Sequence, residues 1–183
     1  MMKVDIYNTD KKYNIIYADP PWHYRTWRDG TGTANKHYKT MKIEEIVAMK
    51  DTIKKISEKD CVLFLWVTFP CLLEGIKTLQ EWGFKYKTCG FTWVKRNKVS
   101  DTWFFGLGHW TRANAEICLI ATKGHIKRIS NKVSQVVDTQ IEEHSKKPAL
   151  VRDRIVELVG NLPRIELFAR QTAEGWDCWG NEV

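Results

Sequence analysis

The chain has 183 residues, enough for one domain with a substantial core and too few for a catalytic domain joined to a large recognition domain. Residues 1–183 are therefore expected to form a single domain. Hydrophobic residues make up 43% and aromatic residues 12%, a composition that excludes an intrinsically disordered chain. The formal net charge of +7 suits a polyanionic partner such as nucleic acid, and it equally suits a protein kept soluble by its charge.

The cysteines and the amino terminus indicate the compartment. Five scattered cysteines form no Cys-x-x-Cys pair, which argues against a disulfide framework and against a zinc site, so no metal is expected. The first ten residues are polar, and nowhere do about 18 uncharged apolar residues run together as a membrane span requires. We expect a soluble cytoplasmic protein that has no membrane partner.

The first half of the chain predicts an alternation of strands and helices. Residues 13–18 form a short apolar run that ends at Asp19, where two prolines stop strand pairing. Residues 23–38 are rich in glycine and rings and predict a long loop. A helical pattern from residue 43 to about 57 precedes the unbroken apolar run 61–67, which is typical of a strand covered on both faces.

The second half repeats this alternation. Pro70 can open a helix that Gly83 ends, and Pro148 can open another that Gly160 ends. Strands are expected at residues 84–94, 116–122 and 164–168. The whole pattern predicts an α/β fold with a doubly wound, mostly parallel sheet. Ligands of such sheets bind beyond the carboxyl ends of strands, which makes Asp19 and Ala169-Arg170 candidate site residues.

The sequence Asp19-Pro20-Pro21-Trp22 has the chemistry to hold an exocyclic amine. Such an amine on an aromatic ring is a poor nucleophile, and two acceptors aimed at its hydrogens can activate it for methyl transfer. The Asp19 carboxylate and the Pro20 carbonyl can be these acceptors, because the prolines fix the turn. Trp22 can offer a face or an edge to a flipped base. A turn that merely ends a strand is the alternative, and these four residues leave both interpretations open.

Eight segments in order resemble the MT-A70-type adenine-N6 methyltransferases, particularly the short bacterial and phage members, from about Tyr13 to Glu182. They are ADPPW (18–22), HYKTM (37–41), FLWVT (64–68), WGFKY (82–86), GLGHWTRANAE (106–116), EHSKKP (143–148), IELFAR (165–170) and GWDCWGNE (175–182). The resemblance implies a Rossmann-like class I methyltransferase that uses S-adenosyl-L-methionine. It also implies a permuted order, with the catalytic motif first and most cofactor-binding residues later.

The resemblance also implies where the cofactor binds. Lys147 is expected at the amino-acid end of the cofactor, with a solvated lysine at a helix start as the alternative. Glu166 and Arg170 are expected at the ribose and amino-acid portions, and an ion pair is the alternative for Glu166. Asn181 and Glu182 are expected to close over the ribose hydroxyls, while Asp19 faces both cofactor and substrate.

The adenine end of the cofactor matches the family less well. Eukaryotic members have a His-Asn pair where this chain has Thr172-Ala173, which puts the contacts of Thr172 in doubt. Asp5-Ile6, before the first strand, is a further candidate for the adenine.

Three basic and aromatic segments are expected to contact the substrate. The loop 23–38 suits closure over a base, with Tyr24 and Tyr38 as contacts, and a packing role is the alternative for Tyr38. Residues 95–112 alternate cations with rings; Lys95 and Arg112 are expected to bind nucleic acid, while about half of the rings are expected to be buried. The basic stretch 123–132 either helps to hold phosphate or is merely solvated.

The leading hypothesis is methylation of adenine N6 in DNA, in the cytoplasm of a bacterium or a phage-infected cell. RNA is the alternative substrate, and cytosine N4 is an alternative target because two acceptors fit both amines. A non-catalytic nucleic-acid-binding partner of the same fold is disfavoured, because that branch of the family has lost the aspartate and the aromatic residue that are Asp19 and Trp22 here. A homodimer or a second subunit is possible because the chain has no separate recognition domain.

Overall fold

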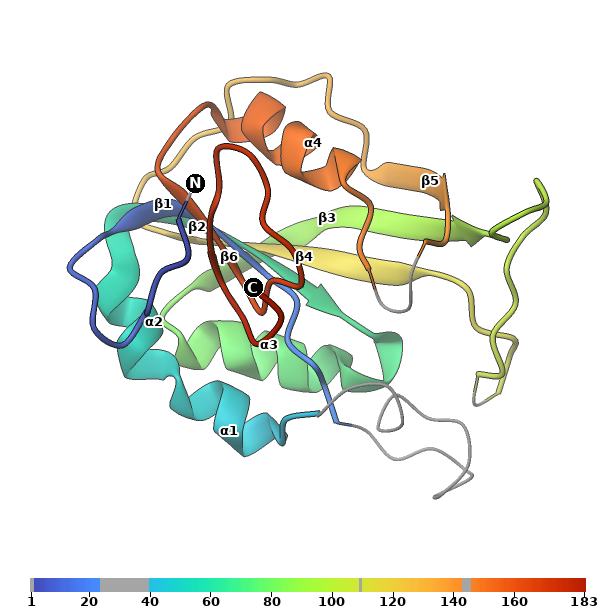
Figure 1. Ribbon diagram of the computed structural model, residues 1–183, viewed down its shortest axis with the longest axis horizontal. Coiled ribbons are helices and arrows are strands. Elements are labelled where there is room, and N and C mark those ends of the chain that lie inside the picture. Colours follow the sequence, from blue (N-terminus) through green and yellow to red (C-terminus); the bar gives the residue numbers. More distant parts are fainter. Residues whose placement is uncertain (1, 24–39, 109, 143–145) are drawn as a thin grey trace.

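The computed structural model describes residues 2–23, 40–108, 110–142 and 146–183. Its strands form one seven-stranded sheet in the order β5-β3-β4-β2-β1-β6-β7 (Figure 1). The strands are β1 (Tyr13–Ala18), β2 (Ser57–Val67), β3 (Lys85–Arg96), β4 (Glu116–Lys123), β5 (Val136–Gln140), β6 (Arg164–Leu167) and β7 (Asp177–Trp179).

All strands except β4 run in one direction. β1 pairs in parallel with β2 and with β6, β6 pairs in parallel with β7, and β3 pairs in parallel with β5. Among the strands named above, only the two pairings of β4, with β2 and with β3, are antiparallel. The predicted α/β fold with a mostly parallel sheet is confirmed, and it is consistent with a Rossmann-like methyltransferase.

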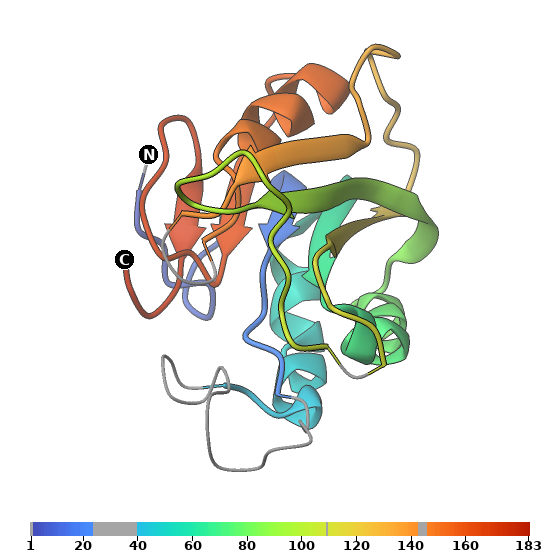
Figure 2. The same ribbon diagram turned by 90° about the vertical axis from the view of Figure 1, so that its right-hand side faces the viewer.

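Helices cover both faces of this sheet (Figures 1 and 2). One face carries α1 (Ile43–Ala48), α2 (Lys50–Ile56), the 3₁₀ turn η2 (Phe69–Cys71) and α3 (Leu72–Glu81), and the other carries α4 (Leu150–Val159). Alternate residues of β2 enter separate cores, with Leu63 and Leu65 on one side and Phe64 and Trp66 on the other. The expectation of a strand buried on both faces is therefore confirmed.

Most element boundaries agree with the sequence, and the differences have local causes. The helix expected over residues 43–57 is two helices that join at Met49. Gly83 and Gly160 follow α3 and α4 with φ of +89° and +95°, values that glycine adopts at little cost. Strands β5 and β7 were not predicted, because β7 has three residues and β5 leaves most side chains exposed, so neither shows a clear burial period.

Two ends of the sheet matter for function. One end, where β1, β2, β3, β6 and β7 terminate and β4 begins, carries Glu116 and the predicted catalytic residue Asp19, and we call it the catalytic end. The opposite end is where those strands begin and β4 finishes at Lys123. The connection between β3 and β4 projects from the catalytic end, to the right in Figure 1. Within the described ranges, no helix is long and apolar enough to cross a membrane.

Candidate active site

The Asp-Pro-Pro-Trp turn is anchored to the ends of two neighbouring strands. The Asp19 N–H donates to the carbonyl of Leu167 in β6 (3.4 Å), and the Trp22 indole N–H donates to the carbonyl of Trp66 in β2 (2.8 Å). The Trp22 backbone N–H donates to the Pro20 carbonyl (2.8 Å), which keeps a second lone pair for a substrate amine. The turn is therefore rigid before any ligand arrives.

The role expected for Trp22 needs correction. Its side chain is 5% exposed and lies in the hydrophobic core, so it does not offer an open ring face to a base. Burial and the bond to Trp66 make it the residue that fixes the turn against β2.

Asp19 is the first member of a chain of four alternating charges. The Lys147 ammonium lies 2.8 Å from Asp19 Oδ2 and 3.2 Å from Glu116 Oε2, and Lys95 lies 2.5 Å from Glu116 Oε1. Among the described residues, only Lys147 bonds to the Asp19 carboxylate, and it does so at one oxygen. The other oxygen, Oδ1, can accept a hydrogen from an amine.

Each member of this charge chain depends on its neighbours. Burial alone would raise the pKa of Glu116, but Lys147 and Lys95 outweigh burial and lower that pKa to about 2. Burial alone would lower the pKa of Lys147, but Asp19 and Glu116 outweigh burial and raise it. Burial raises the pKa of Asp19, and Lys147 opposes this rise. The fixed ammonium, 2.8 Å away, favours the charged form of Asp19 against the effect of burial.

Two cations expected to bind nucleic acid are occupied by the protein itself. Lys95 is paired with Glu116 and keeps only 16% of its side chain exposed, so this geometry does not support the expected phosphate contact, which stays a prediction. The Arg112 guanidinium donates to the carbonyls of Phe105 and Gly106 and thereby shapes the connection between β3 and β4. Three rings of that connection, Trp103, Phe105 and Trp110, are 45%, 56% and 97% exposed, which is more exposure than expected.

Glu166 takes the ion-pair role that was its alternative. Its carboxylate accepts two hydrogen bonds from the Arg152 guanidinium of α4, at 2.6 and 2.8 Å, and the residue is 7% exposed. This pairing ties α4 to β6, and α4 begins just after Lys147. Glu166 therefore helps to hold the backbone that carries Lys147, and its expected contact with the cofactor ribose is not supported.

The ends of β6 and β7 provide polar groups and rings close to Asp19. Arg170 lies 3.9 Å from Glu182, whose side chain is about half exposed. Phe168 has a φ of +60°, which is unusual for a bulky residue and common at functional sites. The centroid of its ring lies 5.3 Å from that of Trp179, and the Trp179 centroid lies 6.0 Å from that of Tyr7. Both ring pairs are T-shaped.

The amino-terminal segment also reaches the ends of β6 and β7, but the residue that lies there is Tyr7 and not Ile6. The Ile6 side chain is 0% exposed in the core, so it cannot contact a cofactor as expected. The Asp5 carboxylate accepts hydrogen bonds from the Tyr7 N–H and the Asn8 amide, which fixes a turn. This turn presents the half-exposed Tyr7 ring beside Trp179.

These groups fit S-adenosyl-L-methionine by their chemistry. Arg170 suits a carboxylate, the exposed Asn181 and Glu182 suit ribose hydroxyls, and the rings of Tyr7 and Trp179 suit an adenine. Strands lie about 4.8 Å apart, so the end of β7 is roughly 10 Å from the end of β1, a span suited to an elongated nucleoside ligand. Thr172 is exposed in the same region, and its cofactor contact stays a prediction.

Two residues that are expected to contact the substrate, Tyr24 and Tyr38, lie outside the described ranges, because they belong to residues 24–39.

Glu116 is not among the site residues expected from the sequence. A carboxylate at the start of the apolar strand segment Ile117–Ala121 is a signal that could have drawn attention to it. The structure brings it against Lys147 and Lys95.

A sequence comparison assigns the family. The MT-A70 family matches residues 13–182. The type II methyltransferase M.MunI of a Mycoplasma species is 34% identical, over 94% of this chain and 78% of that relative. An Arabidopsis thaliana N(6)-adenosine-methyltransferase MT-A70-like protein is 27% identical over 99% of this chain, and the Pyricularia oryzae N6-methyladenosine RNA methyltransferase MTA1 is 26% identical over 93%.

The chain spans 25% of the plant relative and 47% of the fungal one, so these similarities concern one part of longer proteins. The match covers both halves of the site, the Asp19 turn and the segment from Lys147 to Glu182. The chain belongs to the MT-A70 family of S-adenosyl-L-methionine-dependent methyltransferases.

Proposed function

We propose that this protein transfers the methyl group of S-adenosyl-L-methionine to the exocyclic N6 amine of adenine in DNA. The observation that carries the proposal is the Asp19 carboxylate, held at Oδ2 by Lys147 with Oδ1 left to accept a hydrogen, next to the fixed Pro20 carbonyl. Two acceptors at the end of a rigid strand suit an amine with two hydrogens.

The residues of the chain act on the amine. Oδ1 of Asp19 accepts one N–H and the Pro20 carbonyl accepts the other, which orients the nitrogen lone pair for attack. When bound, S-adenosyl-L-methionine supplies an electrophilic methyl group on a sulfonium sulfur. Positive charge develops on the amine nitrogen as the methyl group arrives, and the preorganised Asp19 carboxylate stabilises it. The nitrogen then releases one proton to Asp19, whose pKa is raised by burial.

The choice of DNA rests on the similarity to M.MunI, a type II methyltransferase of which the chain covers 78%. The fungal MTA1 relative, named as an RNA methyltransferase, makes RNA the second candidate. Adenine is chosen over cytosine because the plant and fungal relatives are named for adenosine methylation.

The test incubates the protein with labelled S-adenosyl-L-methionine and with single- and double-stranded DNA and RNA, followed by digestion to nucleosides. N6-methyldeoxyadenosine is the expected product. N6-methyladenosine from RNA alone would replace the DNA assignment, and N4-methylcytosine would overturn the choice of base.

A variant tests the site. Asp19→Ala should lower the rate at least about a hundredfold, because it removes both the amine acceptor and the stabilising charge. Circular dichroism should show that the fold is intact. Asp51→Ala, which removes an exposed carboxylate on α2, is the matched control and should keep the wild-type rate. Activity retained in Asp19→Ala would show that the reaction occurs elsewhere.

A further inference from the structure

The cations at the catalytic end are largely neutralised by the protein. Lys95 and Lys147 are paired with carboxylates, and Arg96 is bound to Asp101 and Asp138. Such paired cations add little to the attraction of phosphates, because the field of each is cancelled by its partner. A second group of cations, elsewhere in the described chain, is not neutralised in this way.

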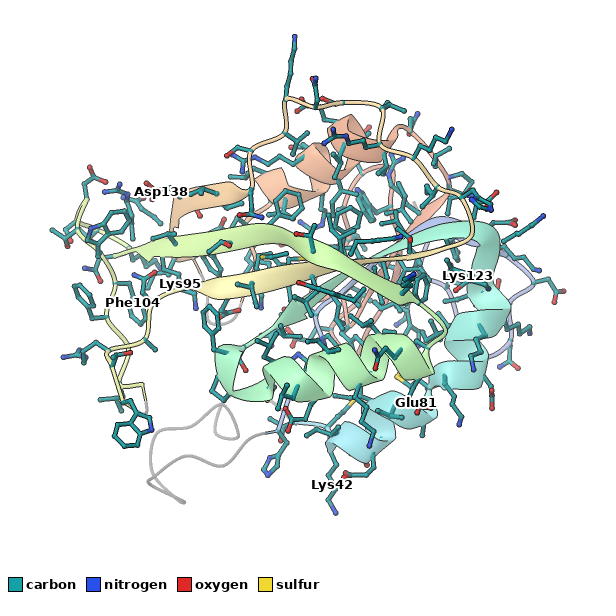
Figure 3. The ribbon with its side chains drawn as sticks, turned by 180° about the vertical axis from the view of Figure 1, so that it is seen from behind. Lys42, Glu81, Lys95, Phe104, Lys123 and Asp138 are labelled. Atoms are coloured by element: carbon teal, nitrogen blue, oxygen red, sulfur yellow. The ribbon has the colours of Figure 1, made fainter. Side chains whose placement is uncertain are left out.

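That charge lies at the opposite end of the sheet, in a group that we call the distal basic patch: Lys85, Lys87, Lys123, Lys127 and Arg128. Four of the five side chains are exposed, and Lys123 is partly exposed. None of the five makes an ion pair or a side-chain hydrogen bond within the described ranges. Figure 3 shows Lys95 and Lys123 at opposite ends of the hairpin formed by β3 and β4.

The patch surrounds a cavity rather than a flat surface. The cavity holds about 360 Å³ and is lined by Lys87, Thr122, Gly124, His125, Ile126 and Lys127. No carboxylate lines it, and the nearby Asp60 is bound to the backbone N–H of His125 (2.7 Å). A concave site with two lysines, a histidine and a threonine hydroxyl suits a phosphate group.

The edge of the sheet is open beside this patch. β5 pairs with β3 only from Thr92 to Arg96, so residues 85–88 have no strand on their outer side and are all exposed. Tyr86 lies between Lys85 and Lys87 and is 39% exposed. The distal part of the β3 edge, next to the patch, is therefore open to a nucleic-acid backbone, whereas β5 covers the part of that edge nearer the catalytic end.

Resting on the proposed function, we infer that the distal basic patch binds the phosphodiester backbone of the DNA substrate on one flank of the target adenine. The eight residues of β4, from Glu116 to Lys123, span roughly 24 Å. At a rise of 3.4 Å per base pair, this length corresponds to about seven base pairs of duplex. The patch should therefore contact a duplex only when more than about seven base pairs lie between the target adenine and the duplex end on the side of the patch.

The test compares Lys87→Gln/Lys127→Gln with Lys55→Gln/Lys77→Gln, which removes two exposed lysines from α2 and α3 that do not line the cavity. Both double variants lose the same charge. Fluorescence anisotropy measures binding to two duplexes, one with about four base pairs and one with about twelve on each side of the adenine. All proteins carry Asp19→Ala, so that binding is measured without methylation.

The patch variant should bind the long duplex about tenfold more weakly than the control, and its plot of log affinity against log salt should be less steep by about 2, because two phosphate contacts are lost. The short duplex should bind both variants equally. Equal binding of the long duplex by both variants, or an equal loss on both duplexes, would overturn the inference. If the patch binds DNA in this experiment but the protein with Asp19 intact forms no methylated DNA in the labelling test above, the proposed function alone fails.

Discussion

Lys147 donates to Asp19 and Glu116, so a single ammonium links the catalytic turn to the first residue of the antiparallel strand β4. The resemblance to the family placed Lys147 at the cofactor, and that contact stays a prediction. The structure adds a role within the protein, because the lysine determines which oxygen of Asp19 is left for the substrate. Glu116 holds Lys147 from the other side, and Lys95 in turn holds Glu116.

Glu116→Gln should therefore impair catalysis although Glu116 itself is not expected to contact the substrate. The neutral amide holds the Lys147 ammonium less tightly, and a misplaced group at an active site can cost up to about a hundredfold in rate. We expect kcat to fall about tenfold or more with little change in KM, measured by initial rates of methyl transfer. Glu81→Gln, in an exposed pair with Lys50, is the control and should behave as wild type. An unchanged kcat would show that Glu116 does not position Lys147.

At the scale of elements, the close approach of the ends of β6 and β7 brings together residues of the predicted cofactor side of the site. The Ala169 N–H donates to the Trp179 carbonyl (2.9 Å), and Gly180 lies directly against the backbone of Ala169. A Cβ atom at position 180 would overlap that backbone, which cannot move aside as a flexible side chain can. Glycine is therefore required for Arg170 and Glu182 to lie side by side.

Gly180→Ala should separate these two strand ends. We expect a loss of about 1–3 kcal/mol in unfolding free energy from the forced overlap. Calorimetry should also show weaker binding of S-adenosylhomocysteine, the demethylated cofactor. Gly90→Ala is the control, because its Cβ would overlap the side chain of Ile120 and would lie in ordinary contact, at 3.4 Å, with the Cys118 carbonyl oxygen, both away from β7. It should lose stability but keep its affinity, and a similar loss of affinity in both variants would contradict the role of Gly180.

At the scale of the whole molecule, the charge chain couples stability to pH. The Glu116 carboxyl has a pKa of about 2 in the folded protein against an ordinary value of 4.5, which corresponds to about 3 kcal/mol. Because the folded pKa is depressed, the unfolded chain binds more protons between these two values. The stabilisation is fully present above about pH 4.5, and it is lost as the pH falls toward 2.

Denaturant unfolding at a series of pH values measures this coupling. The difference in unfolding free energy between the wild type and Glu116→Gln should shrink by about 3 kcal/mol between pH 5 and pH 2. Other carboxyl groups titrate in both proteins and largely cancel in the comparison. A difference that stays constant over this range would show that Glu116 is not stabilised by its lysines.

Local sequence determined most of the elements of this protein. The apolar runs of β1 and β2, the helices that prolines open and glycines end, and the Asp-Pro-Pro turn follow from burial periods and backbone restrictions that act over a few residues. Strands β5 and β7 could not be predicted, because β7 is very short, β5 exposes most of its residues, and both depend on pairing with distant strands.

The partners of the charged residues were decided only by the tertiary structure. The sequence identified Asp19, Lys147 and Glu166, but not that Lys147 would bond to Asp19 from 128 positions away or that Glu166 would bond to Arg152. Nor did it show that Lys95 would be neutralised by Glu116, while Lys85, Lys87 and Lys127 would have no ion pair with any described residue. Charge pairing depends on distances of a few ångströms between side chains, and these distances exist only once the strands have taken their order in the sheet.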